Sequence, residues 1–459
     1  MTHQFNPTIL REYDIRGIVG ETLTEADAYA LGRTFAARAL EEGARRIAVG
    51  RDGRTHSGML EATLVRGLTD GGADAVMIGM GPSPMLYFAT HYLDVEGGIQ
   101  VTGSHNPAEY NGFKLLLNGR SLFGTDIQAI GRRSASGHWS RGNATTEEVD
   151  IREPYVDRLL EGFSARAFRV GWDAGNGAAG PILDMLVERL PGHHHVLFSQ
   201  VDGRFPNHHP DPTVESNLAD LKALVANEQL DFGIAFDGDG DRIGAIDGRG
   251  RVIWGDQLLM ILAEPVLKAE PGATIIADVK ASQTLFDRIA RLGGQPLMWK
   301  TGHSLIKSKM QETEAPLAGE MSGHIFFKHR WYGFDDALYA AVRLIEAVSE
   351  SGKSLIEIMD SMPKSFATPE MRFQVDEARK FAIVEEVRDR LSSDGAKVNP
   401  TDGVRVSTDD GWWLLRASNT QDVLVARAEA KDEAGVERLI AQIDEQLAKS
   451  GVRRAEVVH

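Results

Sequence analysis

Cysteine is absent from all 459 residues of the sequence. Its absence excludes disulfide bonds, thiolate nucleophiles and thiolate metal sites, and it favours a reducing compartment. A secretory signal is not visible either, because Arg11, Glu12, Asp14 and Arg16 lie where such a signal requires an unbroken apolar stretch. We therefore expect a cytoplasmic protein.

Long apolar runs and an excess of basic residues are also missing. The most apolar segments, such as residues 75–89, contain glycine and proline and are too short to cross a bilayer. The sequence has 50 Lys and Arg against 66 Asp and Glu, a formal net charge of −16. Such an acidic surface repels nucleic acid and anionic lipid, so we expect neither a nucleic-acid partner nor a membrane partner. A small anionic substrate can still bind where Arg and Lys cluster locally.

The composition is that of an ordinary soluble α/β protein, with 42% hydrophobic residues, 25% charged residues and 48 glycines. At about 150 residues per domain, a chain of this length predicts three or four domains. Residues 24–43 have the pattern of a capped amphipathic helix, and residues 47–49 that of a short buried strand. This alternation of helix and strand favours sheets with parallel strands.

One pattern occurs three times along the chain. An apolar strand leads into an Asp-containing loop at residues 47–54, 169–177 and 274–280. After each of these, a later apolar strand leads into a polar loop that contains glycine, and open α/β sheets bind ligands at such strand ends. From about residue 362 the pattern changes to short strands and two helices, which predicts an α+β domain. The predicted domains are residues 1–148, 149–248, 249–362 and 363–459, of which the first three are similar.

The strongest metal signal is the run from Asp237 to Arg242, in which Asp237, Asp239 and Asp241 alternate with glycine. A glycine-hinged loop can turn three carboxylates toward one hard divalent cation. An EF-hand is excluded, because Arg242 and Gly248 stand where that loop requires glycine and glutamate. The alternative is an acidic surface turn, which gains nothing from three like charges directly after an apolar strand. We predict Mg²⁺ at this loop, with coordination positions left for phosphate oxygens and water.

A second loop, Thr-Gly-Ser-His-Asn-Pro at residues 102–107, places the Ser104 hydroxyl among backbone amides, where it can carry a phosphoryl group. His105 is disfavoured as its general base, because adjacent residues in an extended loop point to opposite sides. The sequence contains no Gly-x-Ser-x-Gly elbow. Taken alone, this loop is also compatible with a plain turn that ends in Asn-Pro.

Two further loops offer groups that suit a sugar phosphate. Glu320, Ser322 and His324 alternate, so an extended backbone points all three to one side, toward sugar hydroxyls, while Met321 packs inward. A polar edge strand is the alternative for this segment. Residues 416–420, Arg-Ala-Ser-Asn-Thr, supply a guanidinium, two hydroxyls and an amide, which match a phosphate dianion or form a plain turn.

Together the four loops resemble those of the α-D-phosphohexomutase family, most closely its bacterial phosphomannomutase/phosphoglucomutase branch. The resemblance covers essentially the whole chain. Residues 102–107 are similar to the phosphoserine loop of that family, 237–242 to its metal loop, 319–324 to its sugar-specificity loop and 416–420 to its phosphate-binding loop. The fold that this resemblance implies has three similar α/β domains with mixed, largely parallel sheets and a smaller C-terminal α+β domain around a central cleft.

The resemblance also implies a reaction on hexose phosphates of glucose and mannose. Phosphorylated Ser104 gives its phosphoryl group to the free hydroxyl of the substrate, and the resulting hexose 1,6-bisphosphate turns over and returns its other phosphate. Mg²⁺ is the implied cofactor, held by Ser104, Asp237, Asp239 and Asp241, and hexose 1,6-bisphosphate is the implied activator. The implied catalytic residues are Ser104, Arg16, Lys114 and Arg242. The implied substrate-binding residues are Tyr13, Lys280, His303, Glu320, Ser322, His324, Arg416, Ser418, Asn419 and Thr420.

Two related activities stay open as alternatives. Phosphoglucosamine mutases tend to have Gln at the position of Met321 and Gly at the position of Asn419, and this sequence departs from both. A phosphoserine-dependent sugar phosphatase shares the nucleophile and the metal but releases inorganic phosphate. A catalytically silent binding module requires a broken loop, and none of the four is broken. We expect a monomer, with a dimer as the alternative.

Overall fold

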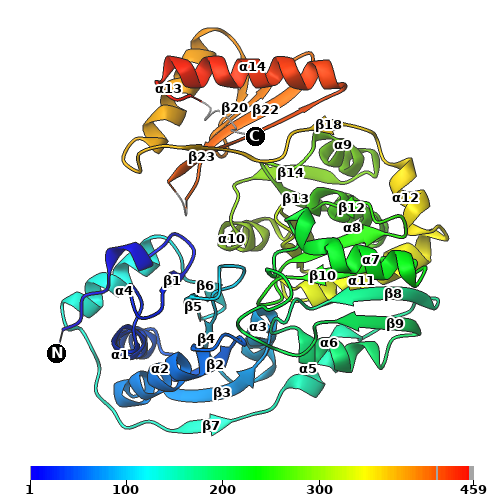
Figure 1. The fold of residues 1–459 in the computed structure, drawn as a ribbon. Helices are drawn as coiled ribbons and strands as arrows, with labels where there is room; N and C mark the ends of the chain where they lie inside the picture. The colour runs from blue at the N-terminus through cyan, green and yellow to red at the C-terminus, as the bar shows by residue number, and fades with distance from the viewer. Residues whose placement is uncertain (1, 420–421, 454–459) are drawn as a thin grey trace.

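The computed structural model describes residues 2–419 and 422–453. This part of the chain contains four sheets, and we call each sheet with its helices a unit, numbered along the chain. In Figure 1 the first unit is blue to cyan, the second and third are green to yellow, and the fourth, orange to red, lies at the top of the view. Among the described residues, no helix combines the length and the apolar character that crossing a membrane requires.

The first unit has a sheet in the order β1-β5-β4-β2-β3-β7, with β6 beside β5. Its strands are β1 (Ile15–Ile18), β2 (Arg46–Arg51), β3 (Asp74–Met80), β4 (Gly97–Val101), β5 (Tyr110–Leu117), β6 (Arg120–Ser121) and β7 (Thr146–Glu148). Its helices are α1 (Glu25–Glu41), α2 (Ser57–Gly71), α3 (Ser83–Tyr92) and α4 (Thr125–Ala135). Helix α1 begins where the sequence predicts, because Thr24 and Asp27 form a capping box that satisfies free amides of its first turn.

The second and third units have sheets of the orders β12-β11-β10-β8-β9 and β14-β13-β15-β16-β17. The second contains β8 (Phe168–Asp173), β9 (Gly192–Leu197), β10 (Phe232–Phe236), β11 (Ile243–Asp247), β12 (Val252–Ile253), α5 (Arg152–Leu159), α6 (Gly180–Val187) and α7 (Ala219–Asn227). The third contains β13 (Thr274–Asp278), β14 (Gln295–Trp299), β15 (Leu317–Gly319), β16 (Ile325–Phe327), β17 (Phe334–Asp335), α8 (Gly255–Ala269), α9 (Gln283–Arg291), α10 (His303–Thr313), α11 (Ala337–Ser351) and α12 (Leu355–Ser361).

The fourth unit has an antiparallel sheet in the order β18-β23-β22-β21-β20, with β19 beside β23. Its elements are β18 (Phe366–Ala367), β19 (Met371–Gln374), α13 (Lys380–Ser393), β20 (Lys397–Asn399), β21 (Val404–Ser407), β22 (Gly411–Ala417), β23 (Val423–Ala430) and α14 (Glu433–Lys449). Both helices lie on the side of the sheet that faces away from the other units (Figure 1). The expected C-terminal α+β unit is therefore present.

The first three units share one topological feature that positions the site. In each sheet one strand pairs in parallel on one side and antiparallel on the other: β4 between β2 and β5, β10 between β8 and β11, and β15 between β13 and β16. The hairpin loops that follow these strands are the three polar loops of the repeated sequence pattern. The predicted fold of three similar α/β units and one α+β unit is confirmed, and the domain boundaries at residues 148, 248 and 362 stay predictions.

Candidate active site

A cavity of about 900 Å³ lies among loops of all four units. The predicted site residues that line it are Tyr13, Arg16, Ser104, Lys114, Asp241, Arg242, Lys280, His303, Glu320, Ser322, His324, Arg416, Ser418 and Asn419. Asp237 and Asp239 are fully buried, and each takes part in the contacts of residues that line this cavity. Thr420 lies outside the described residues. The structure thus brings together the predicted residues that it describes.

Ser104 is buried and has a left-handed backbone with φ of +50°. Its hydroxyl donates to Asp237 Oδ2 at 3.3 Å, so the Ser104 loop and the metal loop meet at this oxygen. The same hydroxyl lies 3.2 Å from His105 Nδ1. The expectation that His105 points away from Ser104 is therefore wrong, because alternation requires an extended backbone and the left-handed turn brings the neighbouring ring back to the hydroxyl.

The three aspartates of the metal loop bring one oxygen each to within 4.8 Å of one another. Asp239 Oδ1 and Asp241 Oδ1 are buried without a hydrogen-bond partner among the described residues. Burial, followed by the charges of Asp241 and Asp239, raises the pKa of Asp237 well above its usual range. Oxygen ligands that converge, with buried lone pairs left unsatisfied, suit a hard divalent cation. The residues present therefore fit the Mg²⁺ that was predicted here.

Two basic residues of the predicted site, Lys114 and Arg16, lie near the metal loop and the Ser104 loop. Lys114 Nζ, on β5, donates to Asp239 Oδ2 at 2.6 Å and to Asp241 Oδ2 at 2.5 Å. Burial disfavours the charge of this ammonium, yet Asp239 and Asp241 hold the Lys114 pKa well above its usual value. Arg16, on β1, pairs with Asp14 and donates to Asn106 Oδ1 at 2.5 Å, within the loop of Ser104. The pocket around Ser104 therefore carries concentrated charge of both signs.

The segment Glu320–His324 differs from the expected extended strand. It is a tight turn that joins β15 to β16, with Gly323 at φ of +87° and the Glu320 N–H bonded to the His324 carbonyl at 2.9 Å. Glycine adopts this left-handed conformation easily. The prediction assumes an extended backbone from Glu320 to His324 and therefore misses the turn. Met321 consequently lines the cavity and does not pack inward. Glu320 is buried and accepts a bond from the Gly302 N–H at 2.6 Å.

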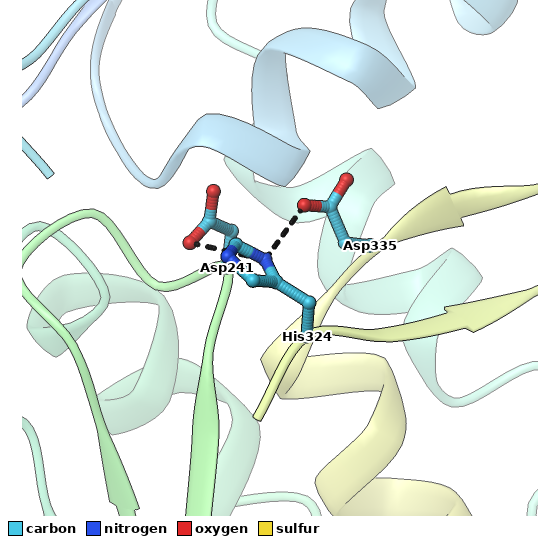
Figure 2. A group of neighbouring side chains, drawn as sticks. All are labelled: Asp241, His324 and Asp335. Atoms are coloured by element: carbon cyan, nitrogen blue, oxygen red, sulfur yellow. Dashed lines mark hydrogen bonds and ion pairs between the residues drawn. The ribbon is translucent and has the colours of Figure 1, made fainter. Parts of the chain in front are cut away.

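Both ring nitrogens of His324 are engaged, as Figure 2 shows for one of them. Nδ1 lies 2.9 Å from Asp335 Oδ2 and 3.7 Å from Asp241 Oδ1. Nε2 accepts from Arg242 Nε at 2.9 Å. With Arg242 donating to Nε2, the remaining ring proton belongs on Nδ1, toward Asp335. His324 thus ties the metal loop of the second unit to the turn of the third.

Tyr13 and His303 form the wall between the first and third units. The Tyr13 hydroxyl donates to the Thr301 carbonyl at 2.9 Å and accepts from Asn419 Nδ2 at 2.7 Å. His303 begins α10 and stacks on His324 with ring centroids 5.6 Å apart. Burial lowers the pKa of His303 well below its usual value, so its ring is neutral.

Two basic side chains of the cavity wall near the fourth unit, Arg416 and Lys280, each donate to a carboxylate. Arg416 Nε, at the end of β22, donates to Asp402 Oδ2 at 2.9 Å. Lys280 Nζ donates to Glu370 Oε1 at 2.8 Å and lies 3.8 Å from Asp278 Oδ2. A guanidinium and an ammonium at one wall supply the donors that a phosphate group requires.

Several residues that shape the site have no counterpart among the predicted ones. They are Asp52 and Arg54 below the Ser104 loop, Asp335 beside His324, and Asp402 and Glu370 beside the cations of the fourth wall. For Asp52 a signal exists in the sequence, because it lies in the first of the three Asp-containing loops that follow equivalent strands. Arg54 lies in the same loop. Asp335, Asp402 and Glu370 lie outside the repeated loops, and no local pattern marks them.

Comparisons with known proteins agree with this geometry. Four models of the phosphoglucomutase/phosphomannomutase family match in order: domain I at residues 7–140, domain II at 153–250, domain III at 254–366 and the C-terminal domain at 370–446. The chain is 46% identical over 433 residues to a phosphomannomutase/phosphoglucomutase of Pseudomonas aeruginosa, covering 94% of each chain. It is 44% identical over 437 residues to a phosphoglucomutase of Neisseria gonorrhoeae, covering 94% of this chain and 95% of that one. The crystal structure of a phosphoglucomutase/phosphomannomutase family protein from Burkholderia thailandensis superposes with a TM-score of 0.93 at 40% identity, covering 98% and 99% of the two chains.

Proposed function

Because the chain belongs to the phosphoglucomutase/phosphomannomutase family, we propose that it is an isomerase of the intramolecular phosphotransferase class. Its proposed reaction interconverts hexose 1-phosphate and hexose 6-phosphate of glucose and mannose. The observation that carries this proposal is the contact between Ser104 Oγ and Asp237 at the wall of a cavity whose other walls present Glu320 and Arg416. The proposed nucleophile, sugar-binding carboxylate and phosphate-binding cation thus line one cavity.

In the proposed mechanism Ser104 carries the phosphoryl group. The bond from Ser104 Oγ to phosphorus breaks as a hydroxyl oxygen of the hexose phosphate bonds to phosphorus. The proton of that hydroxyl passes to the freed Ser104 Oγ, and the product is hexose 1,6-bisphosphate. The bisphosphate then presents its other phosphate to the freed Ser104, which takes it back. Such transfers depend on in-line positioning and on neutralised phosphoryl oxygens. Arg16 on β1, Lys114 on β5 and Arg242 in the metal loop provide the neutralising charge in this proposal.

The metal of the proposed mechanism is Mg²⁺, and the residues that hold it are Asp237, Asp239, Asp241 and the phosphorylated Ser104. Bound there, Mg²⁺ supplies positive charge next to the transferring phosphoryl group. The two aspartate oxygens that have no hydrogen-bond partner in the described part of the chain support this assignment. A trace of hexose 1,6-bisphosphate is the proposed activator, because it can phosphorylate a free Ser104.

The remaining residues of the cavity bind the substrate in this proposal. Glu320 and Ser322 contact the sugar hydroxyls that glucose and mannose share, with Tyr13, His303 and His324 beside them. Lys280 and the loop of Arg416, Ser418, Asn419 and Thr420 hold the phosphate that does not react. We also propose that the protein acts in the cytoplasm and as a monomer.

Product analysis tests the proposed function. The protein is incubated with mannose 1-phosphate or glucose 1-phosphate, Mg²⁺ and a trace of hexose 1,6-bisphosphate, and phosphorus NMR identifies the position of the phosphate. Conversion to the 6-phosphates with no loss of ester phosphate is the expected result. Release of inorganic phosphate identifies a phosphatase, and faster turnover of glucosamine 1-phosphate identifies a glucosamine-directed enzyme; either result contradicts the proposal.

A further inference from the structure

The backbone of the Ser104 loop rests on a buried arginine. Arg54 follows β2, is 3% exposed, and is not one of the residues that line the cavity. Its guanidinium donates to four backbone carbonyls of the loop: Nη1 to Pro107 at 2.6 Å and Tyr110 at 3.0 Å, and Nη2 to Ser104 at 2.7 Å and Asn106 at 2.6 Å. Its Nε lies 3.2 Å from Asp52 Oδ2.

Asp52 engages the amide side of the same loop. Its Oδ2 accepts from the Gly103 N–H at 3.2 Å and from Thr102 Oγ1 at 2.8 Å, and Thr102 Oγ1 in turn accepts from the Ser104 N–H at 2.8 Å. A Cβ atom at Gly103 would lie 2.5 Å from Arg54 Nε, so the loop backbone packs directly on the guanidinium. Arg54 thus binds backbone carbonyls of the loop, and Asp52 binds a backbone N–H and the Thr102 hydroxyl of the same loop.

This arrangement has an electrostatic consequence for a phosphoserine. Carbonyl oxygens carry partial negative charge, and those turned toward a phosphate dianion on Ser104 would repel it. Four such oxygens are instead bonded to a buried cation that does not line the cavity. The same bonds maintain the left-handed conformation of Ser104, which a residue other than glycine adopts at a cost of about 1 kcal/mol or more.

Arg54 also contacts the unit that carries the metal loop. The Phe205 ring of the second unit lies 5.2 Å from Arg54 Cζ, and a Cβ atom at Gly203 would lie 2.4 Å from Arg54 Cα. At the opposite side of the loop, a Cβ atom at Gly238 of the metal loop would lie 2.5 Å from the Ser104 carbonyl oxygen. The Ser104 loop is therefore fixed between Arg54 and the metal loop.

We propose that Arg54, oriented by Asp52, is a positioning residue for phosphoryl transfer at Ser104. It sets the direction of the Ser104 hydroxyl and removes backbone carbonyls from the path of the phosphate, without touching the substrate. The effect on the rate of phosphoryl transfer rests on the proposed function above. The effect on the conformation of the Ser104 loop does not. A displacement of about 1 Å of a reacting group can lower a rate by about 100-fold, so a loop held by four bonds is a strict requirement.

The test compares Arg54→Lys with Arg343→Lys in the full-length protein. Lysine keeps the charge but lacks the planar fork that reaches four carbonyls. Arg343 is a matched control, because it is 5% exposed, donates to the Leu159 carbonyl at 3.2 Å and does not line the 900 Å³ cavity. Three quantities are measured: hydrogen exchange of the peptide that covers residues 102–110, the single-turnover rate of phosphoryl transfer from phosphorylated Ser104 to glucose 1-phosphate, and KM.

For Arg54→Lys we expect exchange in residues 102–110 to become at least about tenfold faster and transfer to become about 100-fold slower, with KM nearly unchanged. For Arg343→Lys we expect a lower melting temperature with exchange in this peptide and transfer as in the wild type. If Arg54→Lys does not fold, Asp52→Asn is the second variant, and it is expected to change exchange and transfer in the same direction by smaller factors.

Wild-type exchange and wild-type transfer in Arg54→Lys, or in Asp52→Asn where that variant replaces it, would overturn the inference. So would an increase in KM with no change in the transfer rate. If the wild-type protein has no mutase activity, the proposed function fails by itself, and the exchange comparison alone then decides: faster exchange supports the positioning role and unchanged exchange overturns it.

Discussion

Around Ser104, Lys114 and the aspartates of the metal loop form one buried cluster of charges, whereas at the Arg416 loop separate contacts join Arg416 to Asp402 and Asn419 to Tyr13. Lys114, Asp239 and Asp241 form a buried cluster with contacts of 2.5 and 2.6 Å. Arg416 has Asp402 as its carboxylate partner, and Asn419 is joined to Tyr13. In the proposed mechanism, this difference suits a reacting phosphate that requires one fixed geometry and a distal phosphate that is accepted in two orientations of the same bisphosphate.

The buried hydrophobic side chains form one core that several units share and others that belong to a single unit. One cluster of buried side chains runs through the second and third units and includes helix α3 of the first, with Tyr87 and Phe88 among its members. The fourth unit has a separate core. Its contact with the third unit uses polar bonds, such as those from Arg405 Nη1 to the Val279 and Ala281 carbonyls at 2.6 and 2.8 Å, and a small cluster around Trp412. The first unit also has a core of its own, which includes Val101 on β4 and Phe113 on β5 next to the Ser104 loop. The second and third units thus share one core with α3, whereas the rest of the first unit and the fourth unit each pack in a separate one.

Replacing the nucleophile at the fixed end is expected to have the largest effect. Ser104→Ala should lower turnover by at least about 10⁴-fold, because the covalent relay is lost, while substrate binding stays largely intact through the distal end. Steady-state kinetics and calorimetric binding of glucose 1-phosphate measure the two quantities. Ser136→Ala, at an exposed serine after α4, is the control. Near-normal turnover in Ser104→Ala would refute the assignment of the nucleophile.

Weakening the metal site should have the next largest effect. Asp239→Asn, or an excess of chelator, should lower turnover by roughly 100-fold or more, since an unneutralised phosphoserine beside carboxylates repels the substrate. Calorimetric titration with Mg²⁺ should also show weaker binding in this variant. Asp184→Asn, at an exposed position on α6, should change neither quantity. Full activity in excess chelator would contradict the metal site.

Changing the distal end should affect binding more than chemistry. Arg416→Ala removes a planar fork whose charge-assisted bonds contribute roughly 1.5 to 3 kcal/mol each, so KM should rise about tenfold to 100-fold. The variant should also release free hexose 1,6-bisphosphate and stop with unphosphorylated Ser104 until bisphosphate is added. KM and bisphosphate in the medium are measured side by side. Wild-type values for both would show that the fourth unit does not hold the phosphate.

The smallest predicted effect concerns the attachment of the fourth unit and its dependence on pH. Lys280 lowers the pKa of Glu370 from 4.5 to about 2. Because the folded pKa lies below the unfolded value, the pair stabilises the fold fully above about pH 4.5 and loses this contribution as the pH falls toward 2. Glu370 is 32% exposed, so solvent screens the pair, and we expect Glu370→Gln to cost roughly 1 kcal/mol of unfolding free energy at pH 7.

Urea unfolding at pH 7 and at pH 4 measures this difference for Glu370→Gln and for the wild type. The difference should narrow at pH 4. Glu445→Gln, which removes an exposed pair on α14, should change the unfolding midpoint less at pH 7. A difference between Glu370→Gln and wild type that grows toward pH 4 has the wrong sign and would disprove the pairing.

The features of this site that the sequence predicts are local ones. Asp237, Asp239 and Asp241 lie within five residues, and the loops that carry Ser104 and Arg416 follow apolar strands, so composition and periodicity locate them. Two local interpretations are wrong because they assume an extended backbone. The left-handed conformations of Ser104 and Gly323 turn His105 toward Ser104 and fold Glu320–His324 into a turn.

Contacts between distant segments could not be predicted from a single sequence. Lys114 meets Asp239 across 125 positions, and Asp402 meets Thr301 across 101. Their pairing depends on how the units pack, which hydrophobic periodicity within one unit does not encode. The contacts of Arg54 could not be predicted for the same reason, since its four carbonyl acceptors lie about fifty residues further along the chain.

The Tyr13 hydroxyl joins residues of three units, because it is bonded to Thr301 of the third and Asn419 of the fourth. These hydrogen bonds connect the first unit to the fourth, so the four units form a ring around the cavity. Residues near the two ends of the polypeptide meet at the Tyr13 hydroxyl. In the proposed mechanism, a bisphosphate in the 900 Å³ cavity turns over inside this ring in competition with escape from it. In the proposed mechanism, Tyr13 therefore favours retention of the bisphosphate, which must turn over before it leaves, although Tyr13 itself lies in the first unit.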